Sequence, residues 1–166
     1  MAKILIVEDD PLMSRMYQKI FGFEGYQVVM AGDGQEGLDK ARAETPTLIL
    51  LDIMMPKMNG LEVLDKLKLD PATKAIPVVM LTNLAGQQDA EKALSKGAVK
   101  YIIKSEYEPK QVTNMVKEII AGYTREEVPP AATPAPEPAN TSAPTTTPPP
   151  PASVTPTPAP AEEPEK

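Results

Sequence analysis

The chain has 166 residues and a net charge of −6, and it contains no cysteine, histidine or tryptophan. Without cysteine and histidine, a disulfide scaffold, a zinc finger, a thiolate nucleophile and an imidazole base are all excluded. Any chemistry must rely on carboxylates, hydroxyls and lysines, and the acidic balance disfavours general binding to nucleic acid.

Five short apolar runs alternate with segments of helical spacing. The runs are apolar at consecutive positions, which is typical of parallel strands covered on both faces. Apolar residues three or four positions apart in the intervening segments predict helices. In chain order we expect strand 4–7, helix 12–23, strand 26–31, helix 38–42, strand 48–51, helix 61–68, strand 76–81, helix 90–94, strand 99–103 and helix 112–120.

This alternation predicts an α/β fold of the (βα)5 type, a doubly wound five-stranded parallel sheet with helices on both faces. Turn residues agree with it, since Asp33-Gly34 opens the second helix and Gly97 follows the fourth. In open parallel sheets, ligands bind outside the carboxyl ends of the strands. The residues that follow the strands are therefore the place to look for chemistry.

The C-terminal segment has a different composition. Residues 129–166 hold 14 of the 20 prolines, no aromatic residue and one large aliphatic residue, Val154. Such a segment cannot bury enough apolar surface to offset its ordering entropy. We expect a folded domain at 1–122, a short linker at 123–128 and a disordered tail at 129–166, and we favour a passive spacer over a proline-rich ligand or tether.

The N-terminal apolar run ends at Val7. It is far shorter than the ~20 residues that a membrane helix needs, and shorter than the apolar region of a signal peptide. We therefore expect a cytoplasmic protein without membrane insertion.

Polar residues follow four of the predicted strands. The first runs into Glu8-Asp9-Asp10 and the third into Asp52, while Thr82 follows the fourth and Lys104 the fifth. Each has an ordinary explanation by itself, because an acid before Pro11 caps a helix and a lone Thr or Lys is usually a cap or an exposed turn. Together they predict carboxylates, a hydroxyl and an ammonium at one edge of the sheet.

Clustered carboxylates repel one another unless a cation neutralises them, and oxygen ligands favour a hard divalent ion. Mg²⁺ is the expected metal, since the chain offers no Cys or His ligand. Beside such an ion, Thr82 and Lys104 would form a site for the oxygens of a phosphoryl group, with Asp52 placed as the nucleophile.

With their flanking residues, these strand ends resemble the receiver domain of two-component response regulators. The resemblance covers residues 2 to about 121. It implies the flavodoxin-like strand order 2-1-3-4-5 and a stand-alone regulator similar to those of chemotaxis and sporulation, with output by partner binding. The matching segments are Ile4–Asp10, Leu50–Gly60, Val79–Asn83 and Gly97–Lys104.

The resemblance implies roles for individual residues. Asp52 would accept a phosphoryl group from a phosphohistidine on a sensor histidine kinase or a phosphotransfer protein. Mg²⁺ would be held by Asp9, Asp52 and the backbone carbonyl of Met54, with Glu8 acting through a water. The chain would therefore be a phosphoacceptor and not an enzyme that turns over a substrate.

The resemblance also implies a switch. Lys104 would pair with the phosphoryl oxygens, the Thr82 hydroxyl would move to bind them, and Tyr101 would rotate into the space that Thr82 vacates. This shift would change the face made by the fourth helix, fifth strand and fifth helix, and with it the binding of an unidentified protein target. The chain would be a monomer or a phosphorylation-dependent dimer, and it would bind no nucleic acid directly.

Two departures from the family pattern stand near the site. Ser105 follows Lys104 where the family usually has a cis-proline, so we expect a trans bond and a loop of altered shape. Leu84 and Met54 would line the approach to Asp52, and we expect them to modulate water access to the phosphoryl group.

Two other functions stay open on the sequence. A haloacid-dehalogenase-like phosphatase also uses an Asp nucleophile, Mg²⁺, a Thr and a Lys, but its general acid would stand where this chain has Met54. A degenerate receiver that acts as an interaction module without phosphorylation is supported mainly by Ser105. Incubation with a phosphodonor separates the three functions. A receiver would take up phosphate on Asp52, a phosphatase would release phosphate catalytically, and a degenerate receiver would do neither.

Overall fold

The structure is a computed structural model that describes residues 1–83 and 86–125. The chain divides into two units, Met1–Pro129 and Pro130–Lys166. The predicted tail at 129–166 and the predicted role of Leu84 fall outside the described residues.

Strands and helices alternate along the described residues, and the strands form one parallel sheet in the order β2-β1-β3-β4-β5. This confirms the predicted (βα)5 fold and strand order. The last helix continues to Arg125, so the segment predicted as a linker begins inside it. The elements are β1 (Lys3–Val7), α1 (Pro11–Phe23), β2 (Gln27–Ala31), α2 (Gly34–Glu44), β3 (Leu48–Leu51), α3 (Gly60–Leu69), β4 (Val78–Thr82), α4 (Gln87–Ser95), β5 (Lys100–Ile103) and α5 (Pro109–Arg125).

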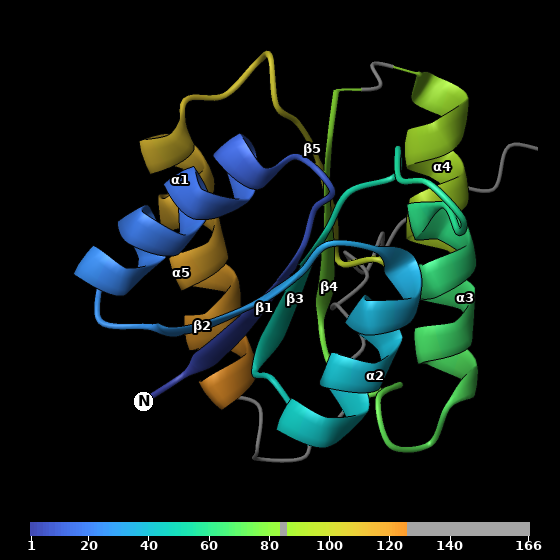
Figure 1. Cartoon of the computed structure of the whole chain (residues 1–166), viewed down its shortest axis with the longest axis horizontal. Coiled ribbons are helices and arrows are strands. Elements are labelled where there is room, and N and C mark those ends of the chain that lie inside the picture. The colour runs from blue at the N-terminus through green and yellow to red at the C-terminus, as the bar shows by residue number, and fades with distance from the viewer. Residues whose placement is uncertain (84–85, 126–166) are drawn as a thin grey trace, which may run out of the picture. The chain divides into compact units, whose positions relative to one another are not determined.

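Helices cover both faces of the sheet (Figure 1): α1 and α5 lie on one face, and α2, α3 and α4 on the other. Each face has its own buried apolar cluster, with Tyr17 and Phe21 of α1 in the first and Val63 and Leu64 of α3 in the second. Because side chains of a strand point alternately to the two faces, all four residues of β3 are buried. The continuous apolar runs of the sequence have this physical origin.

The boundaries of several elements differ from those predicted. The fourth strand runs from Val78 to Thr82 instead of 76–81, because Pro77 has no N–H for the ladder and Thr82 still pairs with Ile103. The second helix begins at Gly34, ahead of the apolar spacing at 38–42 but where Asp33-Gly34 was expected to open it, because the Asp33 side chain caps it by accepting from the Glu36 amide at 2.9 Å. Polar first turns of this kind carry no apolar periodicity.

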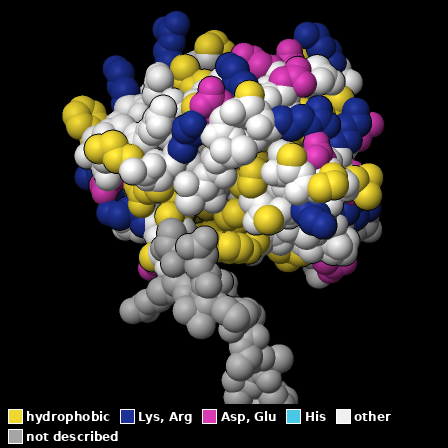
Figure 2. Space-filling view, turned by 90° about the horizontal axis from the view of Figure 1, so that it is seen from below, with side chains coloured by type: hydrophobic (Ala, Val, Ile, Leu, Met, Phe, Trp, Pro, Cys, Tyr) yellow, Lys and Arg dark blue, Asp and Glu magenta, His cyan; other side chains and the backbone are white. Residues whose placement is uncertain are grey.

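The surface bears charges of both signs. On the face in Figure 2, lysines and arginines are interspersed with acids and apolar side chains, so the described part of this face has no continuous basic area. Among the described residues, no helix combines the length and apolar character needed to cross a bilayer.

Candidate functional site

Strand ends from four parts of the sequence meet at one edge of the sheet. Glu8 follows β1, Asp52 follows β3, Thr82 ends β4 and Lys104 follows β5. Backbone hydrogen bonds continue past the strands here: the Asp52 amide donates to the Val7 carbonyl at 3.0 Å and the Lys104 amide to the Thr82 carbonyl at 2.7 Å. The ladder of the sheet therefore fixes the backbone under each of these side chains.

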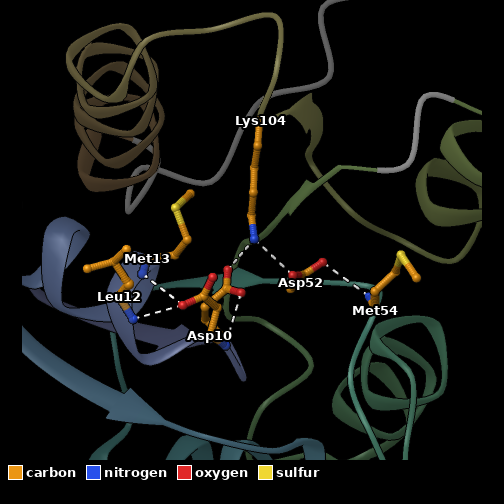
Figure 3. Close-up of polar contacts among 7 residues, drawn as sticks. Asp10, Leu12, Met13, Asp52, Met54 and Lys104 are labelled. Atoms are coloured by element: carbon orange, nitrogen blue, oxygen red, sulfur yellow. Dashed lines mark hydrogen bonds and ion pairs between the residues drawn. The ribbon is translucent and has the colours of Figure 1, made fainter.

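Lys104 joins two of the carboxylates. Its Nζ donates to Asp52 Oδ2 at 2.9 Å and forms an ion pair with Glu8, and Figure 3 shows the ammonium of Lys104 pointing toward Asp52. The three side chains are 4–7% exposed, so water contributes little to their solvation. Sequence reasoning placed Lys104 near a phosphoryl group but missed its direct contact with Glu8.

Two buried carboxylates share this one buried ammonium, and the pKa values of Glu8 and Lys104 reflect this arrangement. Burial, with a smaller contribution from the Asp52 carboxylate, raises the pKa of Glu8 to about 7 despite the hydrogen bond and charge of Lys104. Burial by itself lowers the pKa of Lys104, but the hydrogen bonds and charges of Glu8 and Asp52 outweigh it and hold that pKa above its ordinary value. The site therefore has fewer positive charges than carboxylates.

The acidic run after β1 separates into a cap and two site residues. Asp10 points away from Lys104 and accepts from the amides of Leu12 at 2.8 Å and Met13 at 3.4 Å, so it caps α1 (Figure 3). Glu8 and Asp9 remain, and one carboxylate oxygen from each lies within 4.8 Å of the other and of an Asp52 oxygen. The helix-cap explanation of the sequence thus applies to Asp10.

These oxygen atoms fit a hard divalent cation. With Lys104, the carboxylates of Glu8, Asp9 and Asp52 carry two excess negative charges when all are ionised, and a doubly charged ion would neutralise them. The backbone amide of Met54 donates a hydrogen bond to Asp52 Oδ1 at 3.1 Å. The predicted use of its carbonyl as a metal ligand stays a prediction, as do the metal roles of Glu8 and Asp9.

The two predicted switch residues lie on neighbouring strands. Thr82 is fully buried at the end of β4. Tyr101 is half-buried in β5, where it packs against the cluster that includes Ala93 of α4. Burial raises the pKa of the Tyr101 phenol, and the Asp89 and Asp52 carboxylates raise it further, so the ring stays neutral at neutral pH. Their coupled movement stays a prediction.

The loops that flank the site are closely constrained. Gly60 donates its amide to the Ile53 carbonyl at 2.9 Å, and a Cβ at Gly60 would lie 2.0 Å from the Asp52 carbonyl oxygen. Only glycine allows α3 to begin this close to the end of β3. Beyond β5, the described residues contain no cis peptide bond, which confirms the expected trans bond before Ser105.

Comparisons with known proteins agree with this geometry. The family model described as the response regulator receiver domain matches residues 4–117. The DNA-binding response regulator MtrA of Mycolicibacterium smegmatis is 36% identical over 129 residues, which are 78% of this chain and 54% of that protein. The alkaline phosphatase synthesis transcriptional regulatory protein PhoP of Bacillus subtilis is 37% identical over 118 residues, which are 71% of this chain and 48% of that protein. The chain thus spans about half the length of these relatives.

Solved structures show the same fold. A CheY-like receiver domain protein from Methanospirillum hungatei JF-1 is 35% identical with a TM-score of 0.70, and the match covers 76% of this chain and 98% of that chain. The BeF3-activated N-terminal receiver domain of Klebsiella pneumoniae RstA is 29% identical with a TM-score of 0.66, and the match covers 71% and 97% of the two chains.

Proposed function

Since this chain belongs to the receiver domain family of response regulators, we propose that Asp52 accepts a phosphoryl group from a phosphohistidine on a sensor histidine kinase or phosphotransfer protein. One observation carries this proposal: the Asp52 carboxylate is held between the Lys104 ammonium and the Met54 amide, beside Glu8 and Asp9. These 166 residues contain no histidine, so the phosphohistidine lies outside them.

In this transfer, the protein contributes mainly by positioning the reacting groups and stabilising their charge. An Asp52 oxygen forms a bond to phosphorus while the phosphorus–nitrogen bond of the donor breaks, and its electron pair stays on the imidazole. Lys104 is placed to stabilise the negative charge that spreads over the phosphoryl oxygens. Receiver domains of this family bind Mg²⁺ at an acidic pocket. Here Asp9, Asp52, the Met54 carbonyl and, through a water, Glu8 would hold the ion, which supplies further charge neutralisation when bound.

Output follows from a change at Thr82, which ends β4, and at Tyr101 in β5. In this proposal Thr82 moves toward the phosphoryl oxygens and Tyr101 follows it inward. The face formed by α4, β5 and α5 then binds a protein target differently, either as a monomer or as a phosphorylation-dependent dimer. Self-phosphorylation and autodephosphorylation are the only reactions proposed, because Met54 stands where a phosphatase would need its second acid.

Incubation with Mg²⁺ and a small acyl phosphate tests the proposal. We expect intact-protein mass spectrometry to find one labile phosphoryl group per chain, and none in Asp52→Asn. The matched control is Asp10→Asn, which changes an acid of the same edge that only caps α1 and leaves an equally good capping residue. Asp10→Asn is expected to take up phosphate as the wild type does.

Other outcomes identify the alternatives. A protein that takes up no phosphate while binding its target equally well would be a phosphorylation-independent interaction module. Continuous release of phosphate in excess of the protein would indicate a phosphatase. Uptake that persists in Asp52→Asn would contradict the assignment of the phosphoacceptor.

A further inference from the structure

The loop between β3 and α3 contains a strained residue. Lys57, in this segment of residues 53–59, has φ of 68°, a left-handed conformation that is unfavourable for a residue with a Cβ. It forms the centre of the second of two three-residue turns of the γ type. The backbone bonds that close these turns run from Met55 N–H to Ile53 O at 3.1 Å and from Met58 N–H to Pro56 O at 2.8 Å.

A strained conformation persists where neighbouring groups hold it. Lys57 Nζ pairs with Asp33 Oδ2 at 3.2 Å, across 24 positions of sequence. Asp33 is itself fixed as the N-cap of α2, because its Oδ1 accepts from the Glu36 amide at 2.9 Å. The Glu36 amide and Lys57 hold the pKa of Asp33 below its ordinary value, so the carboxylate is ionised at neutral pH.

The first turn of α2 also contacts this loop through its backbone. A Cβ at Gly34 would lie 3.1 Å from the Met58 carbonyl oxygen and 2.7 Å from Val63 Cγ2. Glycine at this position lets α2 approach the loop closely. The ion pair and this packing are separate contacts, and both join the start of α2 to the segment that follows Asp52.

We propose that Lys57 and Asp33 are positioning residues for the phosphorylation of Asp52. Their ion pair holds Lys57 in its left-handed conformation, and the loop then keeps the Met54 amide against the Asp52 carboxylate. Neither residue touches Asp52, so both act through the loop backbone. This inference rests on the proposed function and adds α2 to the elements that shape its site.

Removing either partner tests the coupling. Lys57→Met removes the charge and keeps the length of the side chain, and Asp33→Ser keeps a capping oxygen that is too short to reach Lys57. With Mg²⁺ and an acyl phosphate, we expect each variant to phosphorylate about two- to fivefold more slowly, the range for a surface pair of this kind. The double variant is expected to be no slower than the slower single variant, because both changes break the same pair.

Two further variants serve as controls. Lys57→Arg keeps the charge and is expected to retain the wild-type rate. Arg42→Met breaks another surface pair of α2, the 2.5 Å contact between Arg42 and Asp70 at the end of α3, which lies outside the loop. Arg42→Met is expected to phosphorylate at the wild-type rate.

Lys57→Gly tests whether the pair acts through the backbone conformation of Lys57. Glycine removes the conformational penalty at φ of 68° and also removes the ion pair. Because glycine adopts this conformation without the pair, we expect this variant to phosphorylate faster than Lys57→Met, close to the wild-type rate, and to unfold at the same or a higher urea concentration than the wild type. A rate as low as that of Lys57→Met would contradict an action through this conformation.

A measurement without phosphodonor, the NMR resonance of the Met54 amide, separates a failure of this inference from a failure of the proposed function. The Met54 amide resonance reports the position of the loop, and we expect it to shift in Lys57→Met and Asp33→Ser but not in Arg42→Met. If the wild type takes up no phosphate, the proposed function fails and this resonance alone decides the role of the pair. Wild-type rates in both single variants, effects that multiply in the double variant, or an unmoved Met54 resonance would overturn the inference.

Discussion

At the scale of single residues, Glu8 is a carboxylate whose environment differs strongly from water. Its side chain is 4% exposed and shares the Lys104 ammonium with Asp52. The negative charge of an ionised Glu8 is therefore only partly neutralised by Lys104, and water does not reach it to provide the missing solvation. The carboxylate gains more from a proton than it would at the surface.

This predicts a pH dependence of stability that Glu8→Gln removes. The folded-state pKa is raised from 4.5 to about 7, so the folded chain binds the proton more tightly than the unfolded chain. Glu8 thus contributes stability that is fully present below pH 4.5 and is lost as the pH rises through 7. Measured by urea unfolding with a chelator present, the wild type should lose up to ~3 kcal/mol over this range relative to Glu8→Gln. Parallel curves for the two proteins would contradict the prediction.

Sequence reasoning reached the site residues but not their contacts. The positions of Asp52, Thr82 and Lys104 after predicted strands were sufficient to place them at one edge, because parallel strands end together. The residue pattern alone did not distinguish the acids of the run 8–10, since which of them caps α1 depends on side-chain direction, and only the family resemblance assigned separate roles to Glu8 and Asp9. The pairing of Lys57 with Asp33 was missed because the residue pattern does not indicate the left-handed φ that Lys57 adopts.

At the scale of elements, the junction of β3 with α3 determines where Asp52 stands. Asn59 caps α3 by accepting from the Glu62 amide, and the Glu62 side chain accepts in return from the Asn59 amide. The helix therefore begins one residue before its predicted start, at Gly60, in contact with the backbone of Asp52. An Asn-Gly pair can also form a hairpin turn, and the apolar spacing from Leu61 correctly favoured the helix.

Gly60→Ala is predicted to disturb this junction. The added Cβ would lie 2.0 Å from the Asp52 carbonyl oxygen and 2.8 Å from Ile53 Cα, and backbone atoms cannot move aside as a flexible side chain would. We expect a loss of about 1–3 kcal/mol in the free energy of unfolding and slower phosphorylation of Asp52.

The matched control is Gly22→Ala in α1, where a Cβ meets nothing within 4 Å. It should gain about 0.5–1 kcal/mol, because alanine is the better helix former. If urea titrations gave Gly60→Ala the same stability as Gly22→Ala, the close approach would have no energetic consequence.

At the scale of the whole molecule, the described apolar clusters extend from Ala2 to Ile120. The composition of the sequence placed the folded domain in this same range. The limit of the last helix was harder to place, because α5 continues three residues beyond the boundary expected at 122, where polar residues leave no apolar spacing.

Removal of residues 129–166 is therefore predicted to leave folding and phosphorylation intact. We expect the chain ending at Val128 to match the full chain within ~0.5 kcal/mol in urea unfolding, as a change outside a core does. Its rate of phosphate uptake should also be the same. Binding of the protein target tests the passive-spacer interpretation, and loss of that binding in the shortened chain would contradict it.

The contacts of Lys104 span 96 positions to Glu8 and 52 to Asp52. During synthesis, Asp52 emerges from the ribosome well before Lys104, and until then it is an isolated carboxylate on a nascent chain. Heat or denaturant that separates the strands returns it to that condition. Under the proposed function, a phosphodonor would find a competent acceptor only on folded molecules, and the amount of phosphorylated protein would also report how much of the population is folded.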